Sequence, residues 1–241
     1  MCLLVVLWRV TEDAPLVVAA NREEFYARGG EPPRRLDGVL AVGGVDPHQG
    51  GTWLGVNAAG VLIAVTNRAK SELPPEPRSR GLLARDLLGA GSAREAAERA
   101  ATALDSGLYA GCNLLCADGR DCLVLHGGDW LRMAPLPPGV HVLANRDVND
   151  PTDPRVTQAR QQLGGRNLTS WGEAWPALRE LCSSEGICFR AAERGTVSSS
   201  FLVLPGAIHE GIYLHAQGAP DRASYVDQSH LLRGLVPSWK G

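Results

Sequence analysis

Pairs of strand-like segments joined by short polar turns recur along this chain, and this pattern limits the folds open to it. Residues 2–10 and 15–20 are apolar, β-branched runs separated by a polar turn. Residues 111–117 and 121–126 flank Asp118-Gly119, a dipeptide that favours a tight hairpin turn. Hairpins join antiparallel strands, so mostly antiparallel sheets are expected. Further strands are predicted at 39–43, 52–56, 61–67, 140–144, 197–204, 210–216 and 222–227.

Two pairs of helices interrupt the hairpins. One pair is predicted near 80–90 and 92–105 and the other near 154–163 and 170–182, with capping signals ahead of three of them. The order of hairpins, helix pair, hairpins, helix pair and final hairpin predicts one α+β domain over residues 1–241. Two mostly antiparallel sheets between helix layers would accommodate this order. Loops are expected at 27–37, 46–51 and 70–80.

Charge and hydropathy exclude several kinds of partner. The 24 basic and 26 acidic residues give a formal net charge of -2, and no basic block marks a nucleic-acid partner. No apolar stretch approaches the roughly 20 residues that a membrane span needs, and the first strand lacks the flanks of a signal peptide. A soluble, cytoplasmic protein is therefore expected, in which the six cysteines stay reduced. The sequence leaves the oligomeric state open.

Cys2 stands out by its position in the chain. If Met1 is removed, a thiol and a free α-amine share the first residue, and together they form a nucleophile and its base. Their ordinary pKa values, about 8.5 for the thiol and about 7.7–8.0 for the amine, allow proton transfer between them near neutral pH. The alternative is a small apolar residue that opens a core strand, since free cysteine is commonly buried and inert.

Polar residues at the ends of other predicted strands could complete a site around Cys2. A thiolate needs a cation, the amine needs a carboxylate, and a tetrahedral oxyanion needs amide donors. The candidates of these three kinds are Arg22, Glu23 or Glu24, Asn67 and Asn145. The alternative interpretation is that they are surface charges and turn-forming asparagines.

Several blocks of sequence together carry a family resemblance. Met1-Cys2 precedes an apolar strand, and Ala20-Asn21-Arg22-Glu23-Glu24 closes the next strand. Later blocks are Gly50-Gly51-Thr52-Trp53-Leu54-Gly55-Val56, Thr66-Asn67-Arg68, Ser79-Arg80-Gly81 and Cys112-Asn113-Leu114-Leu115. With these blocks the chain resembles the NRDE family, also called the transport and Golgi organisation family, over most of its length.

That family is similar to N-terminal nucleophile amidohydrolases of the choloylglycine hydrolase and penicillin acylase kind. The resemblance implies a four-layer αββα sandwich in which Cys2 is the thiol nucleophile. It also implies that Arg22 and Glu23 lie around the thiol and that Asn67 and Asn145 supply hydrogen-bond donors. The candidates for substrate contacts are Asn21, Glu24, Trp53 and Arg194.

Two positions depart from the family pattern. Glu23 stands where the family has aspartate, and the extra methylene shifts the carboxylate. Val197 stands where the family usually has arginine, and Arg194 is the candidate substitute. Spacing leaves open whether Arg22 or Asn21 faces the thiol, because alternate residues of an extended strand point to opposite faces.

A second group of cysteines, with one histidine, lies on the predicted hairpin at 111–126. Cys112, Cys116, Cys122 and His126 lack the Cys-x-x-Cys pairs of zinc sites, so core cysteines are expected and no metal is assigned. The sequence also lacks a Gly-rich phosphate loop and a serine nucleophile elbow. No cofactor is therefore predicted.

The leading hypothesis is a cytoplasmic N-terminal cysteine hydrolase that cleaves an amide or related acyl bond of a small molecule. The rival hypothesis is a binding or trafficking protein that holds haem or an acyl ligand in the same pocket without turnover. Glu23 and Val197 favour the rival, because both depart from the hydrolase pattern.

Overall fold

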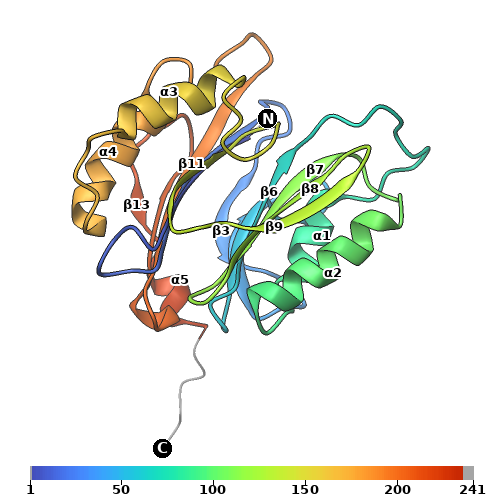
Figure 1. The fold of residues 1–241 in the computed structure, drawn as a ribbon, viewed down its shortest axis with the longest axis horizontal. Helices are drawn as coiled ribbons and strands as arrows, with labels where there is room; N and C mark the ends of the chain where they lie inside the picture. Colours follow the sequence, from blue (N-terminus) through green and yellow to red (C-terminus); the bar gives the residue numbers. More distant parts are fainter. Residues whose placement is uncertain (1, 236–241) are drawn as a thin grey trace, which may run out of the picture.

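The computed structural model describes residues 2–235, and within them two antiparallel sheets face each other between two layers of helices (Figure 1). The six-stranded sheet has the order β10-β1-β2-β11-β12-β13, and the seven-stranded sheet has the order β3-β4-β5-β6-β7-β8-β9. The predicted α+β class and four-layer αββα arrangement are confirmed.

The strands of the first sheet come from both ends of the chain and from its middle. They are β1 (Cys2–Trp8), β2 (Leu16–Phe25), β10 (Gly139–Leu143), β11 (Arg194–Leu204), β12 (Ile212–Ala216) and β13 (Val226–Asp227). The second sheet follows the chain order: β3 (Glu31–Arg35), β4 (Ala41–Val45), β5 (Leu54–Asn57), β6 (Leu62–Asn67), β7 (Cys112–Ala117), β8 (Cys122–Gly127) and β9 (Leu131–Pro135).

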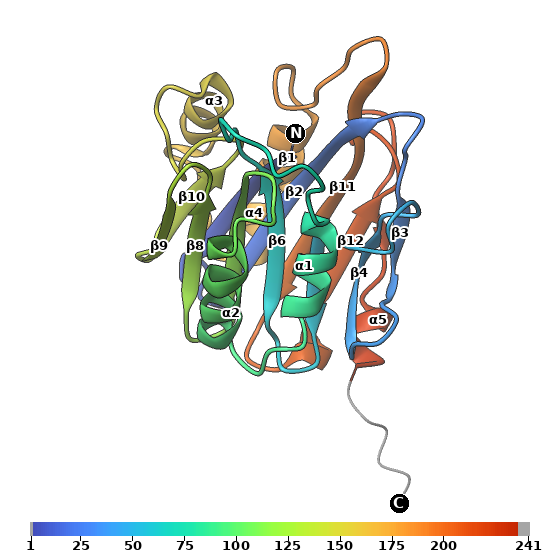
Figure 2. The same ribbon diagram turned by 90° about the vertical axis from the view of Figure 1, so that its right-hand side faces the viewer.

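Each sheet carries one helix pair on its outer face. Figure 2 shows α1 (Arg80–Leu87) and α2 (Ala93–Asp105) lying over the seven-stranded sheet. The helices α3 (Pro154–Leu163) and α4 (Trp171–Ser183) cover the six-stranded sheet (Figure 1). A short helix, α5 (His230–Arg233), ends the described chain. Among residues 2–235, no helix has the length and apolar character needed to cross a bilayer.

The side chains of β1 point alternately to the two faces of the six-stranded sheet, and both faces are covered. Leu4, Val6 and Trp8 are buried between the two sheets, whereas Leu3, Val5 and Leu7 are buried under α3 and α4. A strand that is buried on both faces must be apolar at nearly every position, as this one is. Its first residue, Cys2, is only partly buried because it lies at the end of the sandwich.

The predicted helix starts are confirmed by their caps. Ser92 Oγ accepts a hydrogen bond from the Glu95 amide at 3.1 Å, and Asp153 accepts one from the Arg155 amide at 3.0 Å. Ser170 and Glu173 form the reciprocal capping box, and α4 then continues through Pro176. The Asp118-Gly119 hairpin is also present, joining β7 to β8.

Two edge strands were not expected. Residues 27–37 were predicted as a loop, but β3 lies within them and pairs with β4 through an irregular register. Prolines 32 and 33 are tolerated because they lie at the irregularity in pairing between Glu31 and Arg34, on an edge strand. β9 is mostly exposed at the opposite edge, so it lacks the apolar run that would have predicted it. The last strand, expected at 222–227, is restricted to Val226–Asp227.

Candidate functional site

The register of the first hairpin decides which polar residue lies beside the thiol. Cys2 pairs with Arg22 and Leu3 pairs with Asn21 across β1 and β2. Cys2 and Arg22 therefore share the face that looks toward the second sheet, the same face as Leu4 and Ala20. Asn21 lies on the helix-facing side, where its Nδ2 donates to the Cys182 carbonyl at 2.8 Å. The open question from the sequence is thus answered in favour of Arg22.

Cys2 borders a cavity of about 400 Å³ at the end of the sandwich. β1, a strand of the six-stranded sheet, starts near the N label of Figure 1. A volume in the range of roughly 300–1,000 Å³ is typical of small-molecule pockets. The lining comes from the strand ends, the Gly-Gly-Thr-Trp block and the segment before α1: Cys2, Arg22, Glu23, Glu24, Phe25, Arg28, Asp46, Gln49, Thr52, Trp53, Val65, Asn67, Pro77, Arg78, Ser79, Arg80, Gly81 and Ala110.

The surroundings of the Cys2 thiol shift its pKa in opposite directions. Burial raises the thiol pKa above its usual value, because a thiolate is poorly solvated there. A hydrogen bond from the Glu23 backbone amide and the charge of Arg22 lower it, whereas the Glu23 carboxylate raises it. The chain thus places one amide donor and one cation next to the atom that would become negative.

Arg22 is buried, with 5% of its surface exposed, and its guanidinium group is held by three neighbours. Its guanidinium carbon lies 4.0 Å from the centroid of the Trp53 ring, and its Nη1 donates to the Gly29 carbonyl. Its Nη2 is 3.7 Å from Glu24. A Cβ on Gly44 would come within 2.2 Å of the Trp53 ring, so the glycine lets the indole lie flat under the cation.

Arg155 is a member of the site that the sequence did not predict. Its Nη1 is 3.3 Å from Oε1 and 3.4 Å from Oε2 of Glu23. Its Nη2 donates to Asn145 Oδ1 at 2.8 Å and lies 3.3 Å from Asp153. Burial raises the pKa of Glu23, and the charge of Arg155 opposes this rise. The only signal in the sequence was the cap Asp153-Pro154, which places Arg155 in the first turn of α3.

The two asparagines are neighbours but differ in their access to the pocket. Asn145 Nδ2 donates to the Asn67 carbonyl oxygen at 2.8 Å, which joins the end of β10 to the end of β6. The Asn67 side chain is exposed and lines the cavity of Cys2. Asn145 does not line this cavity; it lies between Asn67 and Arg155 and forms a hydrogen bond with each.

The residues expected to contact substrate are divided between the pocket and its surroundings. Glu24 and Trp53 line the cavity of Cys2. Arg194 lines a smaller adjoining cavity of about 100 Å³, which shares Glu23, Glu24 and Asn67 with the first. Asn21 lies on the helix-facing side of β2 and lines neither of these two cavities. Val197 sits at an irregularity in the pairing of β11 with β2.

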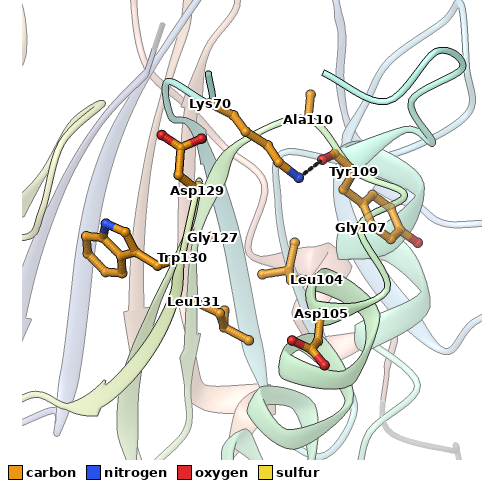
Figure 3. Close-up of a pocket in the computed structure, with 11 residues that line it drawn as sticks. Lys70, Leu104, Asp105, Gly107, Tyr109, Ala110, Gly127, Asp129, Trp130 and Leu131 are labelled. Atoms are coloured by element: carbon orange, nitrogen blue, oxygen red, sulfur yellow. Dashed lines mark hydrogen bonds between the residues drawn. The ribbon is translucent and has the colours of Figure 1, made fainter. Parts of the chain in front are cut away.

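The remaining candidate clusters lie apart from Cys2. Cys112, Cys116 and Cys122 are buried in the second sheet, and the described residues contain no group of three or more metal-ligating side chains. A separate cavity of about 200 Å³ lies between the end of α2 and the β8–β9 turn (Figure 3). There Lys70 Nζ donates to the Tyr109 carbonyl at 3.2 Å, and no residue predicted for the site lines this cavity.

Comparisons with solved structures agree with the fold. The chain is similar to a Caenorhabditis elegans N-acylethanolamine-hydrolyzing acid amidase orthologue, with a TM-score of 0.61 and 17% identity over 86% of this chain and 95% of that one. A variant of conjugated bile acid hydrolase from Clostridium perfringens gives 0.58 and 14% over 97% and 94%. Penicillin V acylase from Agrobacterium tumefaciens gives 0.56 and 13% over 96% and 88%. At these identities the likeness shows the N-terminal nucleophile hydrolase fold alone.

Sequence comparison gives the family. The human Transport and Golgi organization protein 2 homolog is 30% identical over 149 residues, which are 56% of this chain and 52% of that protein. The Bos taurus homolog is 32% identical over 148 residues with the same coverage. The chain therefore spans about half the length of the curated relatives it matches. The model of the family Transport and Golgi organisation 2 matches residues 1–174 of 241. Because that match covers well over half of the sequence, the chain belongs to the Transport and Golgi organisation 2 family.

Proposed function

We propose that this protein is an N-terminal cysteine hydrolase that cleaves an amide or related acyl bond of a small molecule. The observation that carries the proposal is the position of Cys2. Its thiol is at the first residue of a central strand, shares a face with Arg22 and borders a cavity of about 400 Å³. The hydrolase names of the structural neighbours are consistent with this chemistry, although they describe those proteins.

The first half of the reaction uses the thiol and the α-amine of Cys2. Removal of Met1 frees the α-amine of Cys2, which takes the proton of the thiol. The sulfur attacks the substrate carbonyl, a C–S bond forms, and the carbonyl oxygen becomes an oxyanion. The scissile C–N bond then breaks, and the leaving amine takes the proton back from the α-ammonium group. A thioester on Cys2 remains, and water hydrolyses it by the same proton route.

The surrounding residues have distinct roles in this scheme. Arg22 stabilises the thiolate, and its stacking on Trp53 keeps it from leaving the strand end. Glu23 orients the α-ammonium group while Arg155 keeps that carboxylate ionised. The Asn67 amide, which borders the pocket, donates to the oxyanion. Asn145 donates one N–H to the Asn67 carbonyl oxygen, and its other N–H is the second donor to the oxyanion in this scheme.

The cellular setting proposed here is the cytoplasm. All six cysteines are free, including three buried in the second sheet. A reducing compartment keeps such thiols from oxidising, and it also preserves the nucleophile.

Turnover assays test the proposal directly. Purified protein should hydrolyse a member of a panel of acyl amides, and Cys2→Ala should abolish this activity. Cys188→Ala is the matched control, because Cys188 is also a free cysteine but hydrogen-bonds Asp221 outside the pocket. Loss of turnover in both variants, or in neither, would contradict the assignment of Cys2.

Ligand binding without turnover is the second candidate function, and one observation favours it. Burial raises the pKa of the Cys2 thiol, which reduces the thiolate available for attack. Titration with haem, followed by its absorption spectrum, separates the two functions when run beside the amide panel. Tight haem binding that persists in Cys2→Ala, with no amide turnover, would support a binding protein.

A further inference from the structure

We propose that the substrate is an N-acyl amino acid whose free carboxylate is bound by Arg78 and Arg80 on the wall of the Cys2 pocket. This inference rests on the proposed hydrolase function and adds the chemical class of the substrate. Its basis is the charge balance of the pocket lining.

Every acidic side chain in the lining already has an arginine partner. Glu24 lies 3.7 Å from Arg22 and 3.9 Å from Arg28. Asp46 forms a close ion pair with Arg28, and this arginine holds the pKa of Asp46 below its usual value against the effect of burial. Glu23 is paired with Arg155, which comes from behind the pocket. No acidic group of the lining is therefore left to neutralise a further cation.

Arg78 and Arg80 are the cations without a carboxylate partner in this lining. Within residues 2–235, no carboxylate oxygen lies within 4.0 Å of either guanidinium. Arg80 is partly buried and Arg78 is exposed, and both border the same cavity as Cys2. The wall of the pocket thus carries two positive charges that the protein itself does not compensate.

Both guanidinium groups are anchored in ways that leave donors available. Arg80 Nη1 donates to the Gly111 carbonyl at 2.9 Å, so its other N–H groups remain for a ligand. Arg78 lies over the Tyr109 ring at 5.7 Å, and its backbone amide donates to the Leu108 carbonyl. Stacking on a ring leaves the in-plane N–H groups of a guanidinium free.

The segment that carries these arginines is locked against the Gly-Gly-Thr-Trp block. The Thr52 amide donates to the Gly81 carbonyl at 2.9 Å. A Cβ on Gly51 would come within 2.3 Å of the Gly81 backbone, so only glycine permits this approach. Cys2 and Arg22 come from the six-stranded sheet, whereas Arg78 lies just before α1 and Arg80 is the first residue of that helix, which covers the other sheet. Cys2 and the two arginines therefore line one cavity although they belong to different layers of the fold.

A carboxylate fits this arrangement better than a neutral group does. The planar fork of an arginine matches the two oxygens of a carboxylate, and hydrogen bonds to charged groups are stronger than neutral ones. An amide that carries a carboxylate near its nitrogen would be oriented with its carbonyl toward Cys2. We expect such a substrate to have a kcat/KM about ten-fold or more above that of its neutral analogue.

Matched substrate pairs test the inference by kinetics. N-acylglycines of several chain lengths are compared with the corresponding N-acylglycine methyl amides, in wild-type protein and in Arg78→Gln, Arg80→Gln and the double variant. The expected result is a preference for the carboxylate in the wild type. The double variant should lose this preference through a higher KM for the carboxylate substrate, with kcat little changed. Arg166→Gln, at an exposed pair with Glu180, is the control.

Binding measurements keep the test independent of turnover. Calorimetric titration of Cys2→Ala protein with an N-acylglycine should show binding that is weakened about ten-fold or more by the double arginine substitution. Circular dichroism of each variant verifies that it is folded. Equal affinity for the acid and its neutral amide, or no effect of the double substitution, would overturn the inference. Absence of turnover with selective binding of the acid would reject the hydrolase function and retain the carboxylate site.

Discussion

The guanidinium group of Arg155 bridges Glu23, at 3.3 Å, and Asn145, at 2.8 Å, which lie on two different strand ends of one sheet. Glu23 is 4% exposed, so its charge depends on this partner. One side chain from α3 thereby fixes both the carboxylate beside Cys2 and the asparagine behind Asn67.

Arg155→Gln should lower activity and shift its pH dependence. Removal of the cation raises the pKa of Glu23 further, because the largest charge that opposes the effect of burial is then lost. If the ionised carboxylate is required, the acid limb of the kcat/KM profile moves to higher pH. The loss of stability should stay below the roughly 3–5 kcal/mol of a fully buried pair, since Arg155 is partly exposed. Arg160→Gln, exposed on the same helix, is the control; an unshifted acid limb in Arg155→Gln would exclude this role for Glu23.

Gly44→Ala should disturb the site through Trp53. The new methyl group would overlap the indole ring, which must then move away from Arg22. Overpacking of this kind costs roughly 1–3 kcal/mol, and the thiolate would lose a fixed cation. Thermal unfolding and kcat/KM are measured together. Gly119→Ala is the matched control, because its Cβ would meet no atom within 4 Å. Equal melting temperatures and equal kcat/KM values in the two variants would show that the Arg22–Trp53 contact does not affect activity.

Stability should fall as the pH drops below the ordinary histidine range. Burial lowers the pKa of His126 and His215 below 6.5, so the unfolded chain binds more protons than the folded one in this window. Their contribution is complete above about pH 6.5 and is lost as pH falls toward the folded pKa values, by up to roughly 1.4 kcal/mol per pH unit for each group. Asp147, Arg68 and Arg132 lie near His126 and modulate its shift. Urea unfolding between pH 7 and 5 measures the slope, and a flat profile would contradict the buried neutral histidines.

An N-terminal extension that cannot be removed should abolish activity without unfolding the protein. The extension leaves the thiol of Cys2 in place but converts its amine to an amide, which cannot accept the proton. The same extension followed by a protease site that leaves Cys2 first should restore activity on cleavage. Full activity of the uncleaved protein would mean that another group is the base.

Local sequence signals were sufficient for most of the framework. The Asp118-Gly119 turn and the capping box at Ser170 and Glu173 act within a few residues, so their outcome could be predicted from the sequence. The edge strand β3 was missed because its two prolines are compatible only with an edge or an irregular pairing, and the position of a strand within a sheet is not a local property.

The candidate site could be predicted only in part, because some of its contacts depend on strand register and helix packing. Cys2, Arg22, Glu24, Trp53 and Asn67 converge on one cavity, as blocks of a family pattern should. The face of Arg22 required the β1–β2 register. Arg155 required the packing of α3, because 132 residues separate it from Glu23. Spacing left open whether Asn21 or Arg22 faces the thiol, and the β1–β2 register places Asn21, a candidate for substrate contact, on the face opposite to Cys2.

The most direct test of the central claim is the intact mass and peptide map of the protein after reaction with an activated acyl ester. We expect the mature chain to lack Met1 and to carry one acyl group on Cys2, and Cys2→Ala to carry none. A chain that retains Met1 throughout, or an acyl group found elsewhere with Cys2 unmodified, would contradict the proposed nucleophile.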